Sequence, residues 1–290
     1  MVTQASPQVQ KAYQHCLAIV RSHYENFPVA SILLPRSLRQ PIAVIYAFAR
    51  SADDFADEGQ WSETQRLEKL NHYSRQLETL NVAQPTDPVF IALQDVIHRY
   101  QLPVQLFHDL LTAFKQDVTK KRYANFDEVL QYCRYSANPV GRLLLHLLSQ
   151  DTAVNLQQSD AICSALQLIN FLQDLHQDYA ENNRIYLPQD EMRQWGVTEA
   201  MIQQQQTTDA MRALVQQQLQ RAKSMMLSGA PLGNAIADRF GLQLRMMING
   251  GLRTLKLLEH QQENVFSRPR LKHTDWFAIA YYAVLKKPIS

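Results

Sequence analysis

The chain has 290 residues, of which 46% are hydrophobic and 19% charged, so it can bury a large core and is too apolar to be disordered. Its 29 basic and 27 acidic side chains nearly balance, which argues against general nucleic-acid binding. The 8 glycines and 12 prolines are too few for the many tight turns of a sandwich, a barrel or a doubly wound sheet. The composition therefore predicts an all-α protein.

Apolar residues recur at helical spacing along the whole chain. No low-complexity linker, Gly/Ser hinge or internal repeat divides it, so we expect one domain over residues 1–290. Prolines mark most of the expected helix ends, but Pro139 lies inside a helical pattern and predicts a kink. The expected helices span residues 8–24, 40–58, 62–80, 86–100, 103–120, 126–150, 155–181, 198–227, 232–262 and 273–286.

The segment PIAVIYAFARSADDFADEG, residues 41–59, predicts a helix with one narrow polar stripe. At about 100° per residue, the stripe is formed by Tyr46, Arg50, Asp53 and Asp57. Apolar residues fill the rest of the circumference, an arc too wide for an ordinary surface helix. We therefore expect a mostly buried helix whose carboxylates face inward or into a cleft.

The segment SALQLINFLQDLHQDYAENNRIYLP, residues 164–188, repeats this pattern. Counted as one helix, it places a second set of polar side chains on one stripe: Gln167, Asn170, Asp174, Asp178 and Glu181. Leucine, isoleucine and phenylalanine cover most of the remaining surface. This segment is also expected to be a core helix interrupted by a polar face.

Two carboxylates one helical turn apart repel each other, and on a buried helix the repulsion costs stability unless a cation is near. A single pair is more often a solvated helix face than a metal site. Two pairs, Asp53 with Asp57 and Asp174 with Asp178, each on an otherwise apolar helix, favour a metal. Mg²⁺ prefers carboxylate oxygens and bridges them to phosphate oxygens. The pattern therefore predicts a Mg²⁺-diphosphate site in a helical bundle.

With these motifs the chain resembles the squalene/phytoene synthase family of all-α isoprenoid synthases, and within it the hydroxysqualene synthases of bacterial hopanoid pathways. The resemblance implies a helical bundle around a central apolar cavity. The paired aspartate motifs together are highly specific for the family. The matching segments are NFPVASILLP (26–35), YAFARSADDFADEG (46–59), DVTKKRYANFDEVLQYCRYSANPVG (117–141), LQLINFLQDLHQDYAENNRIYLP (166–188) and FSRPRL (266–271).

The resemblance also implies roles for individual residues. The metal ligands would be Asp53, Asp57, Asp174 and Asp178. The residues that hold diphosphate or intermediates would be Tyr46, Arg50, Gln167 and Asn170, with Asn26, Phe27 and Arg184 as further substrate-binding residues and Tyr132 near the reacting carbons. An arginine can donate two parallel hydrogen bonds to phosphate, and a desolvated pocket strengthens each contact.

The chain departs from the condensing members of the family at Asn264, where some members have an arginine, and in two short segments. Where many of them read S-x-S-F, this chain has Tyr24 to Phe27, and where they tend to read Val-Ala-Gly, it has Ser136 to Pro139. The added polarity lies beside the expected pocket. We expect Tyr132, Ser136 and Asn138 to admit or orient water, with the alternative that Ser136 and Asn138 only satisfy backbone groups at the proline.

The favoured function is ionisation of presqualene diphosphate with Mg²⁺, rearrangement of the carbocation, and capture by water to give hydroxysqualene. The chain has no Gly-rich dinucleotide fingerprint, which favours water over reduction by a nicotinamide. One alternative is a head-to-head prenyl transferase that makes presqualene diphosphate, squalene or phytoene. A second is a helical interaction protein that has lost catalysis. The partners implied are a prenyl diphosphate and other hopanoid-pathway enzymes that receive the product.

Three scattered cysteines and an amino terminus without an apolar signal core favour the cytoplasm. Because the product is a lipid, peripheral contact with the inner face of the membrane is an alternative. The aromatic residues that would form an interfacial patch are Trp276, Phe277, Tyr281 and Tyr282. We expect them instead to dock the last helix onto the core.

Overall fold

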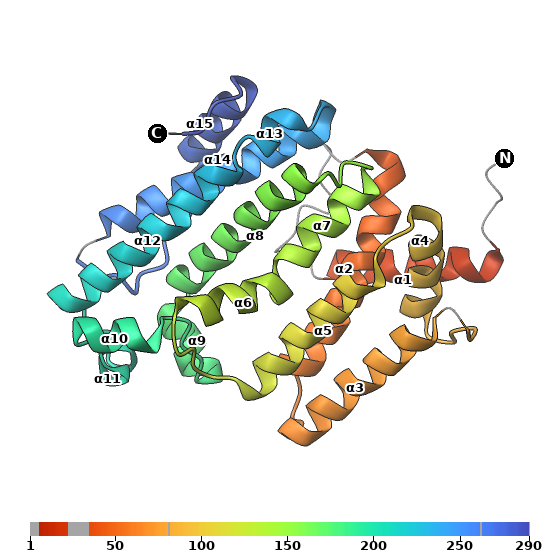
Figure 1. The fold of residues 1–290 in the computed structure, drawn as a ribbon, viewed down its shortest axis with the longest axis horizontal. Coiled ribbons are helices and arrows are strands. Elements are labelled where there is room, and N and C mark those ends of the chain that lie inside the picture. Colours follow the sequence, from red (N-terminus) through yellow and green to blue (C-terminus); the bar gives the residue numbers. More distant parts are fainter. Residues whose placement is uncertain (1–5, 23–34, 81, 262, 290) are drawn as a thin grey trace. The chain divides into compact units, whose positions relative to one another are not determined.

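The computed structural model describes residues 6–22, 35–80, 82–261 and 263–289, and every regular element within them is a helix (Figure 1). The predicted all-α class is therefore confirmed. The helices of the first half are α1 (Pro7–Ser22), α2 (Arg36–Asp57), α3 (Glu63–Thr79), α4 (Pro88–Tyr100), α5 (Val104–Thr119), α6 (Phe126–Ser136) and α7 (Asn138–Leu147). Those of the second half are α8 (Ala153–Gln173), α9 (Leu175–Asn182), α10 (Gln189–Trp195), α11 (Glu199–Gln203), α12 (Asp209–Gly229), α13 (Leu232–Ala235), α14 (Asp238–His260) and α15 (His273–Val284).

The helices form two compact units. Unit 1 comprises residues 1–119 and 142–151, and unit 2 comprises residues 120–141 and 152–290. The two aspartate motifs belong to different units, because α2 lies in unit 1 and the α8–α9 pair lies in unit 2. The expectation of one domain over residues 1–290 remains a prediction.

In unit 1, α2 is held by helices on several sides, since it packs against α1, α3, α4 and α5. Its Phe48 is fully buried in a cluster of aromatic rings, with centroids 5.3 Å from Phe107, 5.9 Å from Phe90 and 5.6 Å from Tyr73. Such edge-to-face and stacked contacts favour one arrangement of the rings. The cluster therefore fixes the rotation of α2 and with it the direction of the polar stripe.

The carboxyl end of α2 is capped by a side chain from α3. The Arg66 guanidinium donates hydrogen bonds to the carbonyl oxygens of Ala56 (2.8 Å), Glu58 (3.0 Å) and Gly59 (2.9 Å). The last carbonyls of a helix have no partner within the helix, so a donor at this point stabilises its end. Gly59, with a φ of 79°, turns the chain where a side chain would be strained.

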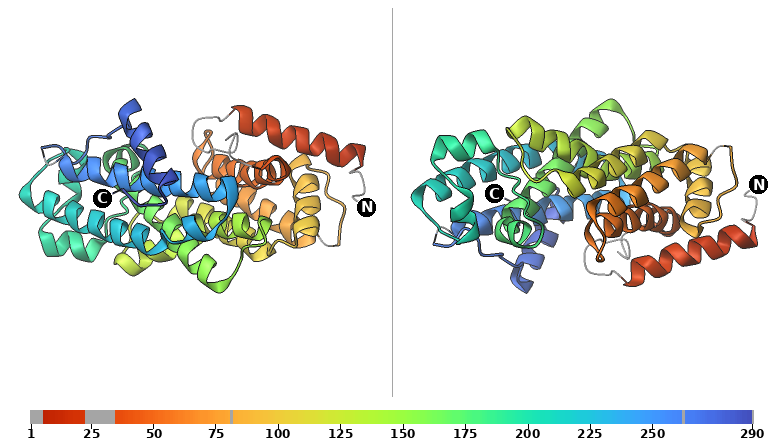
Figure 2. Two further views of the ribbon diagram at one scale, coloured as in Figure 1. Left: turned by 90° about the horizontal axis from the view of Figure 1, so that it is seen from above. Right: turned by 90° about the horizontal axis from the view of Figure 1, so that it is seen from below.

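In unit 2, α8 packs along α12, and α15 lies against α14 (Figure 2). The α8–α12 contact is close because Gly229 faces α8. A methyl group on Gly229 would lie 2.5 Å from the Gln158 carbonyl oxygen and 2.6 Å from Cγ1 of Ile162. The absence of a side chain therefore allows the two backbones to approach.

Several expected helices are wrong in their continuity. Residues 126–150 form α6 and α7, because Pro139 has no amide hydrogen to donate and its ring clashes with the carbonyl group one turn earlier. The expected kink is a helix break. Residues 155–181 are divided at Asp174, whose φ of −111° and ψ of 16° lie outside helical values.

The carboxyl-terminal half is also more divided than expected. Residues 198–227 form α11 and α12, and residues 232–262 form α13 and α14. The short helix α10 was not expected. These breaks leave short helices of four to seven residues, which periodicity over a window of about 11–18 residues cannot resolve.

No helix of the described residues is long and apolar enough to cross a bilayer.

We predict that Gly229→Ala destabilises the protein by about 1–3 kcal/mol, because the added methyl group overpacks the α8–α12 contact. The matched control is Gly250→Ala in α14, where an added methyl group meets nothing within 4 Å. This control should be neutral or up to about 1 kcal/mol more stable, since alanine favours a helix over glycine. Urea unfolding of the two variants measures the difference, and equal stabilities would contradict the close packing.

Candidate functional site

The carboxyl end of α2 concentrates acidic side chains around one arginine. Arg50 lies 3.3 Å from Asp53 and 2.6 Å from Asp54 through its Nη1 and Nη2 atoms, and it also pairs with Glu58. The Arg50 side chain is 23% exposed, whereas Asp53 is 40% exposed. The predicted stripe is therefore present, with Asp57 exposed at its outer end. The half-buried arginine anchors a patch of carboxylates that solvent can reach.

The charges of this patch shift the pKa of Arg50. Burial alone lowers the pKa, but Asp54, Asp53 and Glu58 together outweigh it, so the pKa lies above its ordinary value. Burial also raises the pKa of Tyr46, one turn before Arg50. The last turn of α2 holds acidic and no basic side chains, at the negative pole of the helix dipole. Such an end favours an additional cation.

In unit 2, Asp174 occupies the junction between α8 and α9. Its side chain is 22% exposed, and one of its oxygens lies 3.0 Å from Nε of Arg268. Burial raises the pKa of Asp174, while Arg268 opposes the shift. Arg268 belongs to the segment FSRPRL, residues 266–271. This segment therefore contacts the second aspartate motif.

The rest of the second stripe follows α8 and α9 in turn. Gln167 and Asp178 are half-buried, and Asn170 is exposed. The amide of Asp178 donates to the Asp174 carbonyl oxygen at 2.8 Å, so the chain stays close to helical across the break. Counting all these residues along one helix was wrong. The polar residues of α8 and α9 nevertheless follow one another along two helices that are nearly continuous at Asp174.

The predicted catalytic Tyr132 belongs to a cluster of four aromatic rings. Phe171 of α8 stacks on Tyr186 with centroids 3.6 Å apart, and Tyr132 lies 6.0 Å and 5.5 Å from these two rings. Tyr123 completes the cluster at 5.7 Å from Tyr132. Tyr123 was missed in the sequence, because its contact depends on how α6 and residues 184–188 meet. The cluster presents aromatic π-surfaces, which attract positive charge.

The polar residues after Tyr132 have different surroundings. The buried Asn138 side chain accepts a hydrogen bond from the Ser164 hydroxyl at 2.9 Å. The Ser136 hydroxyl is buried and has no hydrogen-bond partner within the described part of the chain. Ser136 lies one turn after Tyr132 on α6. The Asn138–Ser164 bond supports the structural role for Asn138 and leaves Ser136 as the hydroxyl able to bind a water.

The segment around Arg184 is held by an arginine that the sequence did not single out. Arg122 binds Glu199 through Nε at 2.7 Å and Nη2 at 2.6 Å, and it donates to the Asn183 side chain at 2.9 Å and to the Asn183 carbonyl oxygen. Asn183 adopts the left-handed conformation that ends α9, with a φ of 51°. Arg184, which follows it, is buried. Arg122 lies 61 residues from Asn183, so no local pattern could reveal the contact.

Asn26 and Phe27, predicted to bind substrate, lie outside the described residues.

The donor set of each unit fits a divalent cation that keeps part of its water shell. Among the described residues no group of three histidine, cysteine, aspartate or glutamate side chains forms a preformed metal site. Mg²⁺ commonly uses one or two carboxylates, with water and substrate phosphate completing its shell. Two carboxylates per unit, one of them the half-buried Asp174, agree with this chemistry. The assignment of the four aspartates as ligands remains a prediction.

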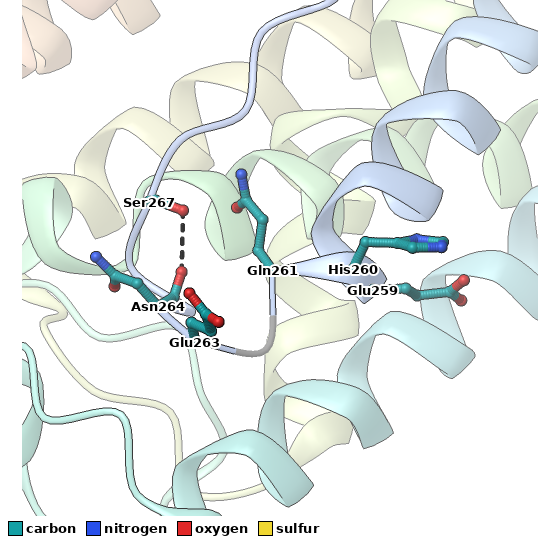
Figure 3. Close-up of a pocket in the computed structure, with 6 residues that line it drawn as sticks. All are labelled: Glu259, His260, Gln261, Glu263, Asn264 and Ser267. Carbon is teal, nitrogen blue, oxygen red and sulfur yellow. Dashed lines mark hydrogen bonds between the residues drawn. The ribbon is translucent and has the colours of Figure 1, made fainter.

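A separate pocket of about 690 Å³ follows the end of α14 (Figure 3). Its lining comprises residues 259–261, 263, 264 and 267, none of which belongs to the predicted site. The Ser267 hydroxyl donates to the Asn264 carbonyl oxygen at 2.9 Å, and Glu259 pairs with Lys223 at 3.3 Å. These polar groups are therefore engaged in local contacts that shape the loop.

Residues 20–276 match the family model described as squalene/phytoene synthase. The chain is 35% identical to a hydroxysqualene synthase of Rhodopseudomonas palustris over 91% of its own length and 89% of that protein. It is 31% identical to a phytoene synthase of Arthrospira platensis, over 73% of its own length and 72% of that protein.

A solved structure is similar as well. The crystal structure of squalene synthase HpnC from Alicyclobacillus acidocaldarius has a TM-score of 0.83 and 34% identity, and the match covers 90% of this chain and 97% of that one. The chain thus belongs to the squalene/phytoene synthase family, whose members act on prenyl diphosphates. The resemblance found in the sequence is confirmed.

We predict that Arg122→Ala loosens the segment that carries Arg184, because Asn183 loses its side-chain and carbonyl partners. Amide hydrogen exchange of residues 183–187 should become about tenfold faster. Arg212→Ala is the matched control, since Arg212 pairs with Asp209, which is 96% exposed. If residues 183–187 exchange equally in both variants, Arg122 does not hold this segment.

Proposed function

We propose that the protein converts presqualene diphosphate to hydroxysqualene with Mg²⁺ as cofactor. The carbon–oxygen bond to diphosphate breaks, the cyclopropylcarbinyl cation rearranges, and the oxygen of a water molecule attacks the cation and releases a proton. The observation that carries the proposal is the 35% identity to a hydroxysqualene synthase over nine tenths of the chain. The product would pass to a later enzyme of hopanoid synthesis that accepts a long hydrocarbon alcohol.

The residues of the two acidic clusters supply the binding chemistry. Bound Mg²⁺ would neutralise the diphosphate charge and make diphosphate a better leaving group. Asp53 and Asp57 in unit 1, and Asp174 and Asp178 in unit 2, are the proposed ligands. The pKa of Arg50 is raised, so its guanidinium stays charged at any working pH. A charged guanidinium is the form that binds phosphate.

The other predicted binding residues contribute donors. Tyr46, with its raised pKa, keeps its hydroxyl proton and can donate a hydrogen bond to a phosphate oxygen. Gln167 and the exposed Asn170 carry amide donors and lie about two turns and one turn before Asp174 on α8. Arg184 offers a second guanidinium. These groups are proposed to orient diphosphate and the intermediate, so that most of the catalysis comes from positioning and charge.

The aromatic cluster suits the cationic intermediate. The faces of the Tyr132, Phe171 and Tyr186 rings can stabilise positive charge. The buried Ser136 hydroxyl, one turn after Tyr132 on α6, is proposed to hold the water that attacks the cation. Asn138, bound to Ser164, would keep the α6–α7 break in position.

A head-to-head condensation of two prenyl diphosphates is the second candidate. The 31% identity to a phytoene synthase supports it, because that relative matches 73% of the chain. The same carboxylates and arginines would then bind two diphosphates. A helical protein without catalysis is the third interpretation, and the retained aspartate pairs argue against it.

The experiment that distinguishes these functions incubates purified protein and Mg²⁺, without nicotinamide, with either presqualene diphosphate or farnesyl diphosphate. We expect hydroxysqualene from presqualene diphosphate alone, identified by mass spectrometry. Consumption of farnesyl diphosphate to presqualene diphosphate would establish the condensing function instead. Absence of turnover with both substrates, and with geranylgeranyl diphosphate, would leave the third interpretation. Chelation of Mg²⁺ should abolish turnover by the protein.

We predict that Asp53→Asn and Asp174→Asn each lower turnover by at least about 100-fold, because a neutral amide binds Mg²⁺ weakly while its shape is unchanged. Asp209→Asn is the matched control, since Asp209 is 96% exposed and belongs to no predicted site. It should retain activity. Unchanged turnover in Asp53→Asn and Asp174→Asn would refute the metal assignment.

We predict that Ser136→Ala reduces the share of alcohol among the products by about tenfold, with a smaller effect on diphosphate release, because it removes only the group proposed to hold water. Ser159→Ala, another buried serine of unit 2, is the control. An unchanged product distribution in Ser136→Ala would exclude this role. Asn138→Gly should act through stability, since Asn138 has a structural partner.

A further inference from the structure

The last helix, α15, exposes a continuous apolar face. Phe277 is 78% exposed, Tyr281 62% and Val284 67%, and these positions are spaced four and three residues apart. At about 100° per residue they lie on one stripe of the helix. Trp276 and Leu285 extend the stripe on either side and are also exposed. The expectation that the aromatic residues dock the helix onto the core is therefore wrong for Trp276, Phe277 and Tyr281.

The opposite face of α15 is the one that docks. Asp275, Ile279 and Ala283 are buried against the rest of unit 2. Arg253 of α14 donates to the Asp275 carboxylate at 2.7 Å, and Arg245 donates to the Ala283 carbonyl oxygen at 2.7 Å. These two arginines fix the rotation of α15. The outward direction of the apolar face is thus set by defined contacts.

The outer face lacks the polar residues that a solvent-facing helix surface normally carries. Residues 276–285, WFAIAYYAVL, contain no charged side chain. An apolar stripe of this kind on a surface helix indicates a binding surface. The charges that flank this stripe indicate which kind of surface binds it.

The ends of α15 are basic. Lys272 precedes the helix, Lys286 and Lys287 follow it, and all three are exposed, as is Arg270. The only acidic residue between positions 268 and 287 is Asp275, which is buried and paired with Arg253. Every exposed charge along this segment is therefore positive.

We propose that α15 lies on an anionic bilayer surface, with Phe277, Tyr281 and Val284 immersed among the acyl chains and the flanking lysines at the phosphate level. Aromatic rings favour the region between headgroups and hydrocarbon, and an anionic surface attracts nearby lysines. With 12 residues, α15 is about 18 Å long, which suits a helix lying on the surface and not one crossing it.

A second copy of the chain is a less suitable occupant. Because both ends of α15 are basic, a parallel or an antiparallel pairing of two such helices would bring lysines close to lysines. Like charges across an interface oppose association. An anionic membrane surface meets the same positive charges with attraction.

The test is flotation of the full chain with vesicles, in the absence of substrate, so that its outcome does not depend on the proposed enzymatic function. The vesicles are phosphatidylcholine alone or phosphatidylcholine with about a third phosphatidylglycerol. We expect the protein to float with the anionic vesicles and at least about tenfold less with the neutral ones, and salt should weaken the binding. Equal recovery with both vesicles, or no flotation, would overturn the proposal.

Variants locate the surface. Val284→Glu should abolish flotation, whereas Val154→Glu, at a comparably exposed valine of α8 (61%), should not. Lys286→Glu with Lys287→Glu should remove the preference for anionic vesicles. Circular dichroism confirms that each variant is folded. If Val284→Glu and Val154→Glu float equally, or if light scattering shows a dimer that only Val284→Glu dissociates while flotation is unchanged, α15 is not the membrane surface.

Discussion

The repulsion between carboxylates at the end of α2 is the constraint that shapes unit 1. Asp53, Asp54, Asp57 and Glu58 lie within six residues, at the negative pole of the helix dipole, where acidic groups are unfavourable. One arginine, Arg50, partly neutralises them, and Arg66 of α3 binds the last carbonyls. The buried aromatic cluster around Phe48 supplies the packing that holds this unfavourable end in place. The stability of this end therefore depends on the two arginines and on the aromatic packing.

The second aspartate motif is built differently. Asp174 lies at a helix break, half-buried, with a raised pKa and a single arginine from a distant segment, whereas the carboxylates of α2 are more open. Asp178 lies in the first turn of α9, where the helix dipole stabilises a negative charge. The two motifs therefore share a residue pattern and differ in electrostatics. A cation at Asp174 would replace an interaction with Arg268, whereas a cation at α2 would bind beside carboxylates that share Arg50.

The sequence predicts the elements whose causes are local. The all-α class, the polar stripe from Tyr46 to Asp57 and an interruption near Pro139, expected as a kink and found as a break, follow from composition, periodicity and the missing proline amide hydrogen. It does not predict the break at Asp174, because the periodicity continues across it. It also does not reveal Arg122, whose partners Asn183 and Glu199 lie 61 and 77 residues away. Contacts of this range depend on tertiary packing, which the spacing of residues within one helix does not describe.

The sequence also led to the wrong orientation for the aromatic residues of α15, and the reason is general. Its apolar residues surround most of its circumference, so the hydrophobic pattern does not say which face docks, and an assignment based on apolar character alone places all the aromatic residues in the core. A polar group decides instead: Asp275, the one acidic residue of the helix, forms an ion pair with Arg253 and turns the face that contains Ile279 inward. An apolar face left outward at this point exposes surface to water at a cost of about 25 cal/mol per Å². That cost disappears when the face meets an apolar phase such as the interior of a bilayer.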